Sequence, residues 1–560
     1  MMNDIIFNML FRLIRHDACV AFKKHLFNMG NVSVCQHNVL MEKLKRSRHS
    51  DFGKKYRFAE INSVQQFRDT VPVNKYQDLK PYIDRVVAGD VSALFNPGEK
   101  IVMFALTSGT TESSKYVPVT KQFLKEYKRG SFQWGYQMAV DHPDMLSRKI
   151  LAIVSPYDEE YTQTGIPCGA ISGMVAATQK YLARMLYILP YWVYCIPDQH
   201  AKYYTLLRLA MAEPQVGLIT TANPSTLVKI ARFADKYKEN LIRDINDGTF
   251  SFSDKLPQDK LKKINPRLVK NPSRAKELEL VAGEHANFYP KHFWPNIPLL
   301  ATWKGGVLSH YIDILPEFYG DVPIRDLGLI ASEGRMSVPS EDEGCSGVID
   351  LESHFFEFIP EDEYGSDNPR TLLCHELERG RNYYIVLTTS AGYFRYDIHD
   401  LVTVTGFFEE APCIAFLNKG KHISSLTGEK VSEYQVIHAI RTAMKSVDAH
   451  IHYFTVSPCW DVIPYYAVCL EENEELRGVN IEDFKKVFDE DLKQRNCEYL
   501  AKRQTGRLGS PKIFLIKKGT FDRLQYQKFE RLSGRTEQYK HVYLNPEVDY
   551  HKKFEILATV

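Results

Sequence analysis

Several features that would point directly to a function are missing from this sequence of 560 residues. Its ten cysteines, which run from Cys19 to Cys497, include no C-x-x-C pair. This absence argues against a zinc ribbon, a dithiol redox motif and a disulfide framework. We therefore expect reduced thiols and a cytoplasmic protein.

Long apolar runs are also missing. The longest apolar stretch, residues 185–196, is too short to cross a bilayer and contains Pro190, so we expect it to belong to a core or to line a pocket. The N-terminal run 5–14 contains Asn8 and Arg12, and no small-residue cleavage site follows it. This pattern favours an amphipathic helix over a signal peptide, and no membrane association is expected.

Neither sign of charge is in excess. The 71 basic and 69 acidic residues leave a formal charge of +2, which gives no reason to expect nucleic acid or an acidic membrane as a partner. Two hydrolase motifs are incomplete as well. Residues 169–173 read G-A-I-S-G instead of G-x-S-x-G, and His375-Glu376 is followed by Arg379 where a zinc protease requires a second histidine.

The chain does have the length and the alternating pattern of an α/β protein. With 44% apolar and 25% charged residues it exceeds a single hydrophobic core, so we expect two or more domains. Apolar runs at 101–106, 151–154 and 216–220 predict buried strands, and the spacing over 226–244 predicts one amphipathic helix. Residues 254–277 are rich in Lys, Pro and Asp and are expected to form a solvated excursion.

The pattern changes after residue 347. Short β-type runs such as 355–359 and 383–388 predict a β-rich subdomain. The stretch 418–429 has two glycines and many small polar residues, which is the composition of a hinge.

A compact α/β unit is expected after this hinge. The apolar patterns predict helices near 432–445 and 481–493, and strands near 453–457, 465–470 and 512–516. The predicted organisation is a large N-terminal domain over 1–418, a hinge over 419–430 and a small C-terminal domain over 431–560.

The segment Thr107–Lys115 carries the strongest chemical signal. It reads T-S-G-T-T-E-S-S-K and follows directly on the predicted strand 101–106. Backbone N–H groups and hydroxyls at the end of a strand can turn toward phosphate oxygens, and Lys115 supplies positive charge. It is not the common phosphate loop, because Ser114 precedes the lysine and Tyr116 follows it. Its spacing resembles the T-S-G-T-T-G-x-P-K signature of adenylate-forming enzymes.

Glu112 departs from that signature, which has glycine at this position. A carboxylate close to a triphosphate is repelled unless it points outward or helps to hold magnesium. Taken alone, the segment is also compatible with a Ser/Thr-rich surface turn.

Three further segments follow in order. Gly328–Gly334 reads G-L-I-A-S-E-G and places Ser332 and Glu333 at a turn, where a carboxylate can hold magnesium. Tyr393–Phe407 contains Asp400, whose two oxygens could bind a ribose diol. Gly534–Lys540 reads G-R-T-E-Q-Y-K. Each segment taken singly also fits a plain turn, a strand end or an exposed lysine.

Taken together, the segments resemble the Gretchen Hagen family of acyl acid amido synthetases, the auxin-responsive type within the adenylate-forming superfamily. The likeness runs over nearly the whole chain and includes P-V-N-K-Y-Q-D-L-K-P-Y-I-D-R from Pro72, T-S-G-T-T from Thr107, F-W-P-N-I from Phe293, A-S-E-G from Ala331, F-R-Y-D-I-H-D from Phe394, V-T-G-F from Val404 and G-E-K-V-S-E from Gly428. Asn418 and Lys419 stand where plant relatives carry arginines, and L-I-A-S-E replaces Y-A-S-S-E, so we expect a member unlike the plant ones.

The resemblance implies an α/β adenylate-forming enzyme fold with a large N-terminal domain, a β-rich subdomain and a small mobile C-terminal domain. It also implies ATP and Mg²⁺ as cofactors. Glu333 is implied to bind the magnesium and to act in catalysis, and Lys540 to swing over the active site from the C-terminal domain. The residues implied to contact the nucleotide are Thr107, Ser108, Gly109, Thr110, Thr111, Lys115, Ser332 and Asp400.

The implied activity is a ligase reaction in which a carboxylic acid is converted to acyl-AMP and then passed to an amine, usually an amino acid. The alternatives are an acyl-CoA synthetase-like ligase and a non-catalytic family member that acts as a binding protein, for which Glu112 is the best support. We expect a monomer with small-molecule substrates. The identity of the acyl acid does not carry over, and an aromatic group either lines its pocket or packs in the core: Tyr187, Tyr191, Trp192 and Tyr194.

Overall fold

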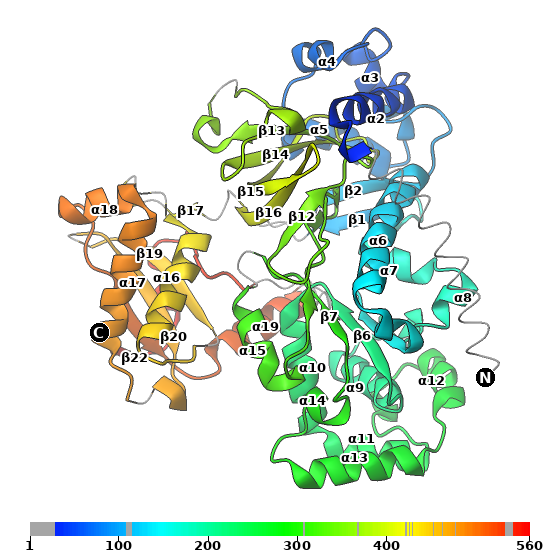
Figure 1. Ribbon diagram of the computed structural model, residues 1–560, viewed down its shortest axis with the longest axis vertical. Helices are drawn as coiled ribbons and strands as arrows, with labels where there is room; N and C mark the ends of the chain where they lie inside the picture. The colour runs from blue at the N-terminus through cyan, green and yellow to red at the C-terminus, as the bar shows by residue number, and fades with distance from the viewer. Residues whose placement is uncertain are drawn as a thin grey trace. The chain divides into compact units, whose positions relative to one another are not determined.

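The computed structural model describes residues 28–107, 115–305, 309–366, 369–419, 423–424, 426–427, 429, 431–451, 453–461, 463–476, 478–531 and 541–560. The chain divides into two compact units (Figure 1). The first unit reaches to Ile398 and includes Val402–Phe416, and the second comprises His399–Leu401 and Leu417–Val560. The amphipathic helix predicted over 5–14 lies outside the described residues, and the hinge over 419–430 stays a prediction.

Two four-stranded sheets and one six-stranded sheet organise the first unit. The mixed sheet, in the order β2-β1-β5-β4, contains β1 (Ile101–Thr107), β2 (Lys115–Thr120), β4 (Glu160–Tyr161) and β5 (Pro167–Gly169). The parallel sheet, in the order β3-β6-β7-β8, contains β3 (Lys149–Ile153), β6 (Val216–Thr221), β7 (Leu299–Ala301) and β8 (Ile324–Arg325).

The six-stranded sheet is the β-rich part predicted after residue 347. Its order is β11-β12-β16-β15-β14-β13, with β11 (Ser337–Val338), β12 (Ser346–Ile349), β13 (Phe355–Pro360), β14 (Asn382–Thr388), β15 (Tyr396–Phe408) and β16 (Ala411–Lys419). A separate small hairpin joins β9 (Ile330–Ala331) to β10 (Gly334–Arg335). Together with the parallel sheet, this architecture confirms the expected mixed α/β fold.

Helices pack around these sheets (Figure 1). The longer ones have apolar faces buried against the sheets or against each other, as α11 and α13 do. Their bounds are α2 (Val32–Ser47), α3 (Asp51–Lys55), α4 (Val64–Thr70), α5 (Tyr76–Val87), α6 (Lys121–Asp141), α7 (Ile171–Ala177), α8 (Tyr181–Arg184), α9 (Gln199–Ala210), α10 (Pro224–Lys236), α11 (Lys238–Asp247), α12 (Gln258–Ile264), α13 (Pro272–Glu284), α14 (Pro290–Phe293) and α15 (Ser309–Tyr319). None of the helices that the structure describes is long and apolar enough to cross a membrane.

The prediction of one helix over 226–244 is wrong, because the structure has two helices, α10 and α11. Helix α10 begins after Asn223, whose side chain accepts a hydrogen bond from the Ser225 backbone N–H. It ends at Tyr237, which has non-helical φ and ψ of −114° and 21°. The Tyr237 ring packs against Phe233 and Phe252 at centroid distances of 4.5 and 5.4 Å. Apolar spacing continues on both sides of this break, so periodicity did not reveal it.

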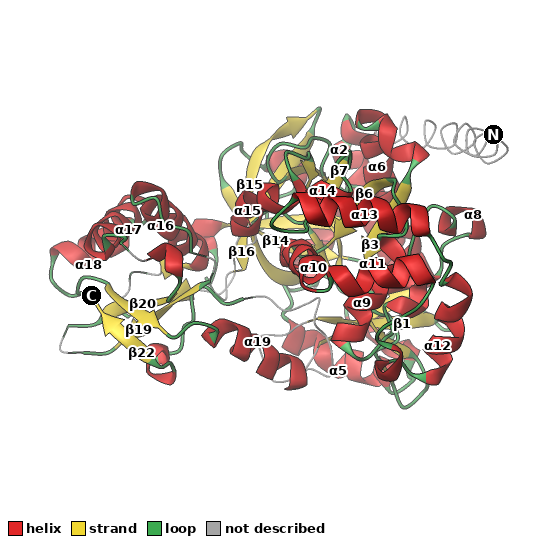
Figure 2. Ribbon diagram, turned by 90° about the horizontal axis from the view of Figure 1, so that it is seen from below, coloured by secondary structure: helices red, strands yellow, loops and turns green. Residues whose placement is uncertain are grey.

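The second unit contains a four-stranded sheet with α16 (Glu433–Ser446) and α17 (Ile481–Arg495) on one side of it (Figure 2). The strand order is β19-β20-β21-β22, with β19 (Phe454–Cys459), β20 (Tyr465–Glu471), β21 (Lys512–Ile516) and β22 (Ile556–Thr559). Helices α16 and α17 pack on each other, and α18 (Cys497–Gln504) and α19 (Thr520–Arg531) follow. The short strand β17 (Ile423–Ser424), in the segment predicted as a hinge, pairs with β18 (Val431–Ser432), which follows that segment directly.

Glu429 anchors that segment to the core of the second unit. Its fully buried carboxylate accepts hydrogen bonds from the Leu426 and Thr427 backbone N–H groups, both at 2.7 Å, and from the Tyr466 hydroxyl at 2.5 Å. Burial alone would raise the pKa of Glu429, but these hydrogen bonds hold the pKa below its usual value.

Arg395 is the main buried charge that ties the N-terminal helices to the six-stranded sheet. Its guanidinium donates two hydrogen bonds of 2.9 Å to the carboxylate of Glu357. A further nitrogen donates to the backbone carbonyls of Arg68 and Val71 at 2.9 and 2.6 Å. Both charged partners are buried, so breaking this pair is costly, although the Arg68 guanidinium also lies 3.5 Å from the Glu357 carboxylate.

We predict that Arg395→Ala lowers the free energy of unfolding by about 3 kcal/mol, because the buried Glu357 carboxylate loses two charge-assisted hydrogen bonds and keeps the more distant Arg68 guanidinium, 3.5 Å away, as its counter-charge. Urea unfolding of the first unit, followed by tryptophan fluorescence, measures the change. The matched control is Arg381→Ala, which removes an exposed ion pair to Glu378 with a 3.4 Å separation and should cost less than about 1 kcal/mol. Equal losses in the two variants would contradict this view of Arg395.

Candidate active site

Strands β1 and β2 form an antiparallel pair that ends at the predicted phosphate-binding loop. Thr107 is paired with Lys115, and Leu106 is paired with Tyr116. The predicted residues Ser108, Gly109, Thr110 and Thr111 lie outside the described residues, as does the side chain of Thr107. Lys115 begins β2, so the loop connects two strands of a hairpin and does not lead into a helix.

Tyr76, the first residue of α5, lies against this hairpin end. Its hydroxyl accepts a hydrogen bond of 3.1 Å from the Tyr116 backbone N–H. The Lys115 ammonium lies 4.8 Å from the centroid of the Tyr76 ring, within range of a cation–π interaction. Burial raises the pKa of Tyr76, and the negative charge of Glu333 adds to this shift. Tyr76 is therefore neutral at physiological pH.

Ser332 and Glu333 are the two residues of the turn between β9 and β10, because Ala331 is paired with Gly334. The Ser332 hydroxyl donates a hydrogen bond of 3.1 Å to the Leu106 carbonyl, at the end of β1. Glu333 is buried, with 6% of its surface exposed. The turn predicted from G-L-I-A-S-E-G is thus fastened to the strand that precedes the phosphate-loop segment.

The segment Y-F-R-Y, which begins at Tyr393, also contacts the end of the β1–β2 hairpin. The Tyr393 hydroxyl donates to the Tyr116 carbonyl at 3.1 Å, and the Tyr393 ring lies 4.7 Å from that of Tyr396. Burial raises the pKa of Tyr393 well above its ordinary value, with the nearby Tyr396 and Glu333 acting in the same direction. Lys115, Ser332, Glu333 and the start of the Y-F-R-Y segment therefore share one neighbourhood in the first unit.

The remaining predicted residues are not placed in this neighbourhood. Asp400 lies in β15 with 2% of its surface exposed, and the segment His399–Leu401 groups with the second unit. Asp397, the other acid of the segment, accepts a hydrogen bond of 2.9 Å from the Tyr364 hydroxyl. Lys540 lies outside the described residues. The roles of Asp400 and Lys540 stay predictions.

Models of the GH3 family match most of this chain. The GH3 family N-terminal domain matches residues 23–324, the central domain matches 347–419 and the C-terminal domain matches 434–547. The chain belongs to the GH3 family. The resemblance to the Gretchen Hagen family is thereby confirmed.

Several plant members of the GH3 family are similar over most of their length. An indole-3-acetic acid-amido synthetase of Arabidopsis thaliana, GH3.3, is 24% identical over 91% of this chain and 89% of its own. The 4-substituted benzoates-glutamate ligase GH3.12 of the same plant is 24% identical over 94% and 95% of the two chains. The solved structure of the GH3.15 acyl acid amido synthetase matches with a TM-score of 0.83 at 21% identity, covering 97% of this chain and 96% of the other, which confirms the GH3 fold.

In the aromatic group near residue 190, Tyr194 and Tyr191 differ in burial, and the acyl-pocket role stays a prediction. Tyr194 is a core residue, since 4% of it is exposed and its hydroxyl donates to the Ala152 carbonyl at 2.5 Å. Tyr191 is half-buried, donates to Asp158 at 2.5 Å and accepts from the Tyr157 backbone N–H at 2.9 Å. Two hydrogen bonds therefore hold Tyr191 at a half-buried position, whereas Tyr194 is fully inside the core.

Tyr76 and Tyr393 were not predicted as site residues, although both lie in stretches that resemble the family. Tyr76 belongs to P-V-N-K-Y-Q-D-L-K and Tyr393 to Y-F-R-Y. The signal that could have found them is an aromatic residue inside a shared motif, although the apolar face of α5 also accounts for Tyr76. Their importance follows from contacts between distant segments, which spacing along the chain does not reveal.

Gly334 leaves the turn no room for a side chain. A Cβ at this position would lie 2.3 Å from Nε2 of His354, whose imidazole is buried between Phe123 and Phe356. Burial, followed by the charges of Lys43 and Arg129, holds the pKa of His354 well below its usual range. A buried, neutral imidazole therefore packs directly behind the turn that carries Glu333.

We predict that Gly334→Ala lowers the free energy of unfolding by about 1–3 kcal/mol, because the new methyl group overlaps the His354 ring. Denaturant unfolding measures this loss. Gly283→Ala is the matched control: Gly283 lies near the end of α13, no heavy atom lies within 4 Å of the added Cβ, and alanine favours a helix. A Gly334→Ala protein as stable as the control would refute the close packing of the turn.

Proposed function

We propose that this protein is an ATP-dependent acyl acid amido synthetase, which converts a carboxylic acid to acyl-AMP and transfers the acyl group to an amine, with an amino acid as the expected acceptor. The observation that carries the proposal is the hydrogen bond between Ser332 and the Leu106 carbonyl. It brings the A-S-E-G turn to the end of β1, where the T-S-G-T-T segment starts. Membership of the GH3 family, whose plant relatives are named as amido synthetases and a benzoate–glutamate ligase, supports the same activity.

The proposed reaction has two balanced steps. A carboxylate oxygen of the acyl acid attacks the α-phosphorus of ATP, the bond to the β-phosphate oxygen breaks, and pyrophosphate leaves. The nitrogen of an unprotonated amine then attacks the acyl carbonyl, AMP leaves, and the amine proton passes to solvent. AMP is a good leaving group, so the second step depends mainly on orientation and on exclusion of water.

The residues of the first unit fit an ATP site by their chemistry. Lys115 offers a cation for phosphate oxygens, and Ser332 offers a hydroxyl whose lone pairs remain available after it donates to Leu106. Glu333 and Ser332 are oxygen donors on one turn, which is the ligand type that magnesium prefers. When bound there, magnesium would neutralise phosphate charge. Glu333 would hold the ion, while Lys115 would orient the phosphates.

Asp400 and Lys540 complete the proposal through the resemblance to the family. Asp400 is proposed to hold the ribose through its two carboxylate oxygens, and Lys540 is proposed to neutralise phosphate charge during the reaction. The loop residues Thr107, Ser108, Gly109, Thr110 and Thr111 are proposed to surround the phosphates. The protein is further proposed to act in the cytoplasm as a monomer.

We predict that pyrophosphate forms from ATP only when a suitable carboxylic acid is present, and that AMP is released when an amine is present as well. Lys115→Ala and Asp400→Ala should reduce the rate of AMP release by at least about 100-fold, because each removes a contact to the nucleotide. A panel of carboxylic acids assayed by pyrophosphate release, and then of amino acids by mass spectrometry, measures both half-reactions. Lys121→Ala removes a nearby exposed lysine at the start of α6 and should retain full activity.

Different outcomes separate the alternatives. Product formation that requires coenzyme A and no amine would assign an acyl-CoA ligase. ATP binding without turnover across the whole panel would assign a binding protein. Unchanged turnover in Lys115→Ala or Asp400→Ala would remove that residue from the site.

A further inference from the structure

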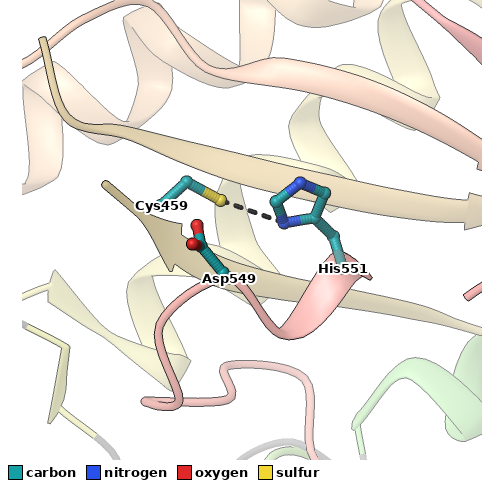
Figure 3. Close-up of side chains that lie close together, drawn as sticks. All are labelled: Cys459, Asp549 and His551. Atoms are coloured by element: carbon teal, nitrogen blue, oxygen red, sulfur yellow. Dashed lines mark hydrogen bonds between the residues drawn. The ribbon is translucent and has the colours of Figure 1, made fainter. Parts of the chain in front are cut away.

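The second unit contains a cluster of three metal-binding side chains, Cys459, Asp549 and His551, which lies outside the residues assigned to the nucleotide. Figure 3 shows the three side chains converging from the end of β19 and from the turn that carries the short helix η11 (Tyr550–Lys553). Cys459 Sγ lies 3.2 Å from Nδ1 of His551. One ligand atom of each of the three residues lies within 4.8 Å of the others.

Independent contacts hold this cluster in place. The Asp549 backbone N–H donates to the Pro458 carbonyl at 2.8 Å, which fastens the C-terminal turn to the residue before Cys459. Asp549 has a left-handed backbone conformation, with φ of 61°. The His551 ring lies 4.6 Å from that of Phe514. The three side chains therefore meet because the surrounding structure positions them, and not only because the thiol and the imidazole attract each other.

The side chains of the cluster are of types that bind metal ions. An imidazole nitrogen and a thiolate sulfur are both zinc ligands, and a thiol gives up its proton when it binds the ion. Cys459 and His551 have 0% and 5% of their surface exposed.

Asp549 supplies an atom that nothing else in the described structure satisfies. Its Oδ2 accepts a charged hydrogen bond of 2.6 Å from Lys552, but its Oδ1 is buried without a hydrogen-bond partner among the described residues. A buried carboxylate oxygen with no partner is unfavourable. The Asp549 side chain as a whole is 29% exposed, so this side of the cluster faces solvent.

We propose that Cys459, Asp549 and His551 bind one zinc ion, with a water molecule as the fourth ligand. Thiolate, imidazole and carboxylate together favour a borderline-soft divalent ion over magnesium or calcium. Tetrahedral zinc, with bonds of roughly 2.3 Å to sulfur and 2.0 Å to nitrogen, separates these two atoms by about 3.5 Å. The observed 3.2 Å would need to open by only a few tenths of an ångström. The thiol proton passes to solvent on binding.

A zinc ion here would stabilise the second unit by cross-linking the end of β19 to the C-terminal turn. This cross-link would hold η11, and the edge strand β22 that follows it, against the sheet. This role uses none of the residues assigned to ATP, so zinc binding is independent of whether the protein is a ligase.

The test is metal binding by the metal-free full-length protein, titrated with Zn²⁺ against a chromophoric chelator. We expect one zinc per chain, and at least about 10-fold weaker binding in Cys459→Ser, His551→Gln and Asp549→Asn. Cys345→Ser removes a half-buried thiol outside the cluster and should bind zinc normally. No binding above background, or equal binding by Cys459→Ser, His551→Gln and the unchanged protein, would overturn the proposal in favour of a simple S–H···N hydrogen bond.

Cobalt substitution gives a second readout that does not depend on the variants folding. Co²⁺ added to the metal-free unchanged protein should produce a cobalt–thiolate charge-transfer band, and excess Zn²⁺ should remove it. Absence of that band would overturn the assignment of Cys459 as a ligand. Its persistence in Cys459→Ser would do the same.

Discussion

The candidate active site depends on the hydrogen bond that joins the Ser332 hydroxyl to the Leu106 carbonyl across 226 residues of sequence. A single hydrogen bond of this kind contributes only about 1 kcal/mol to stability, so its importance is geometric. It places the Ser332–Glu333 turn at the end of β1, and the buried His354 imidazole packs directly behind Gly334.

Two buried tyrosines surround this contact and reduce the polarity of the site. Tyr76 and Tyr393 bind the backbone N–H and carbonyl of Tyr116 from two sides, and burial keeps both phenols neutral. Charges act more strongly on one another where water is excluded. The ammonium of Lys115 and the carboxylate of Glu333 thus lie near uncharged phenol rings, where the proposed phosphate oxygens and magnesium ion would be held more firmly than at an open surface.

Much of the fold could be predicted from the sequence, because it follows from local pattern. Buried strands such as β1 and β6, and capped helices such as α16 with its Ser432–Gln435 capping box, appear where apolar spacing placed them. The break at Tyr237 could not be predicted, since the aromatic contacts that hold it come from Phe252, beyond the end of α11.

For the candidate active site and the proposed zinc site as well, local motifs could be predicted from the sequence and contacts between distant segments could not. The Ser332–Glu333 turn was recognisable from its motif, but its attachment to Leu106 was not. The cluster of Cys459, Asp549 and His551 has no metal-binding spacing, because 90 residues separate Cys459 from Asp549 and only the pairing of the C-terminal turn with β19 brings them together. Sequence spacing identifies metal ligands that lie on one helix, strand or loop. It does not identify ligands that come together only in the tertiary structure.

The most direct measurement of the central claim is a crystal structure of the full-length protein with AMP and magnesium. We predict that the AMP phosphate lies within hydrogen-bond distance of Lys115 or Ser332. We also predict that magnesium is bound by Glu333 and that the ribose hydroxyls donate hydrogen bonds to Asp400. AMP bound elsewhere, with the Ser332–Glu333 turn facing no nucleotide, would contradict the central claim.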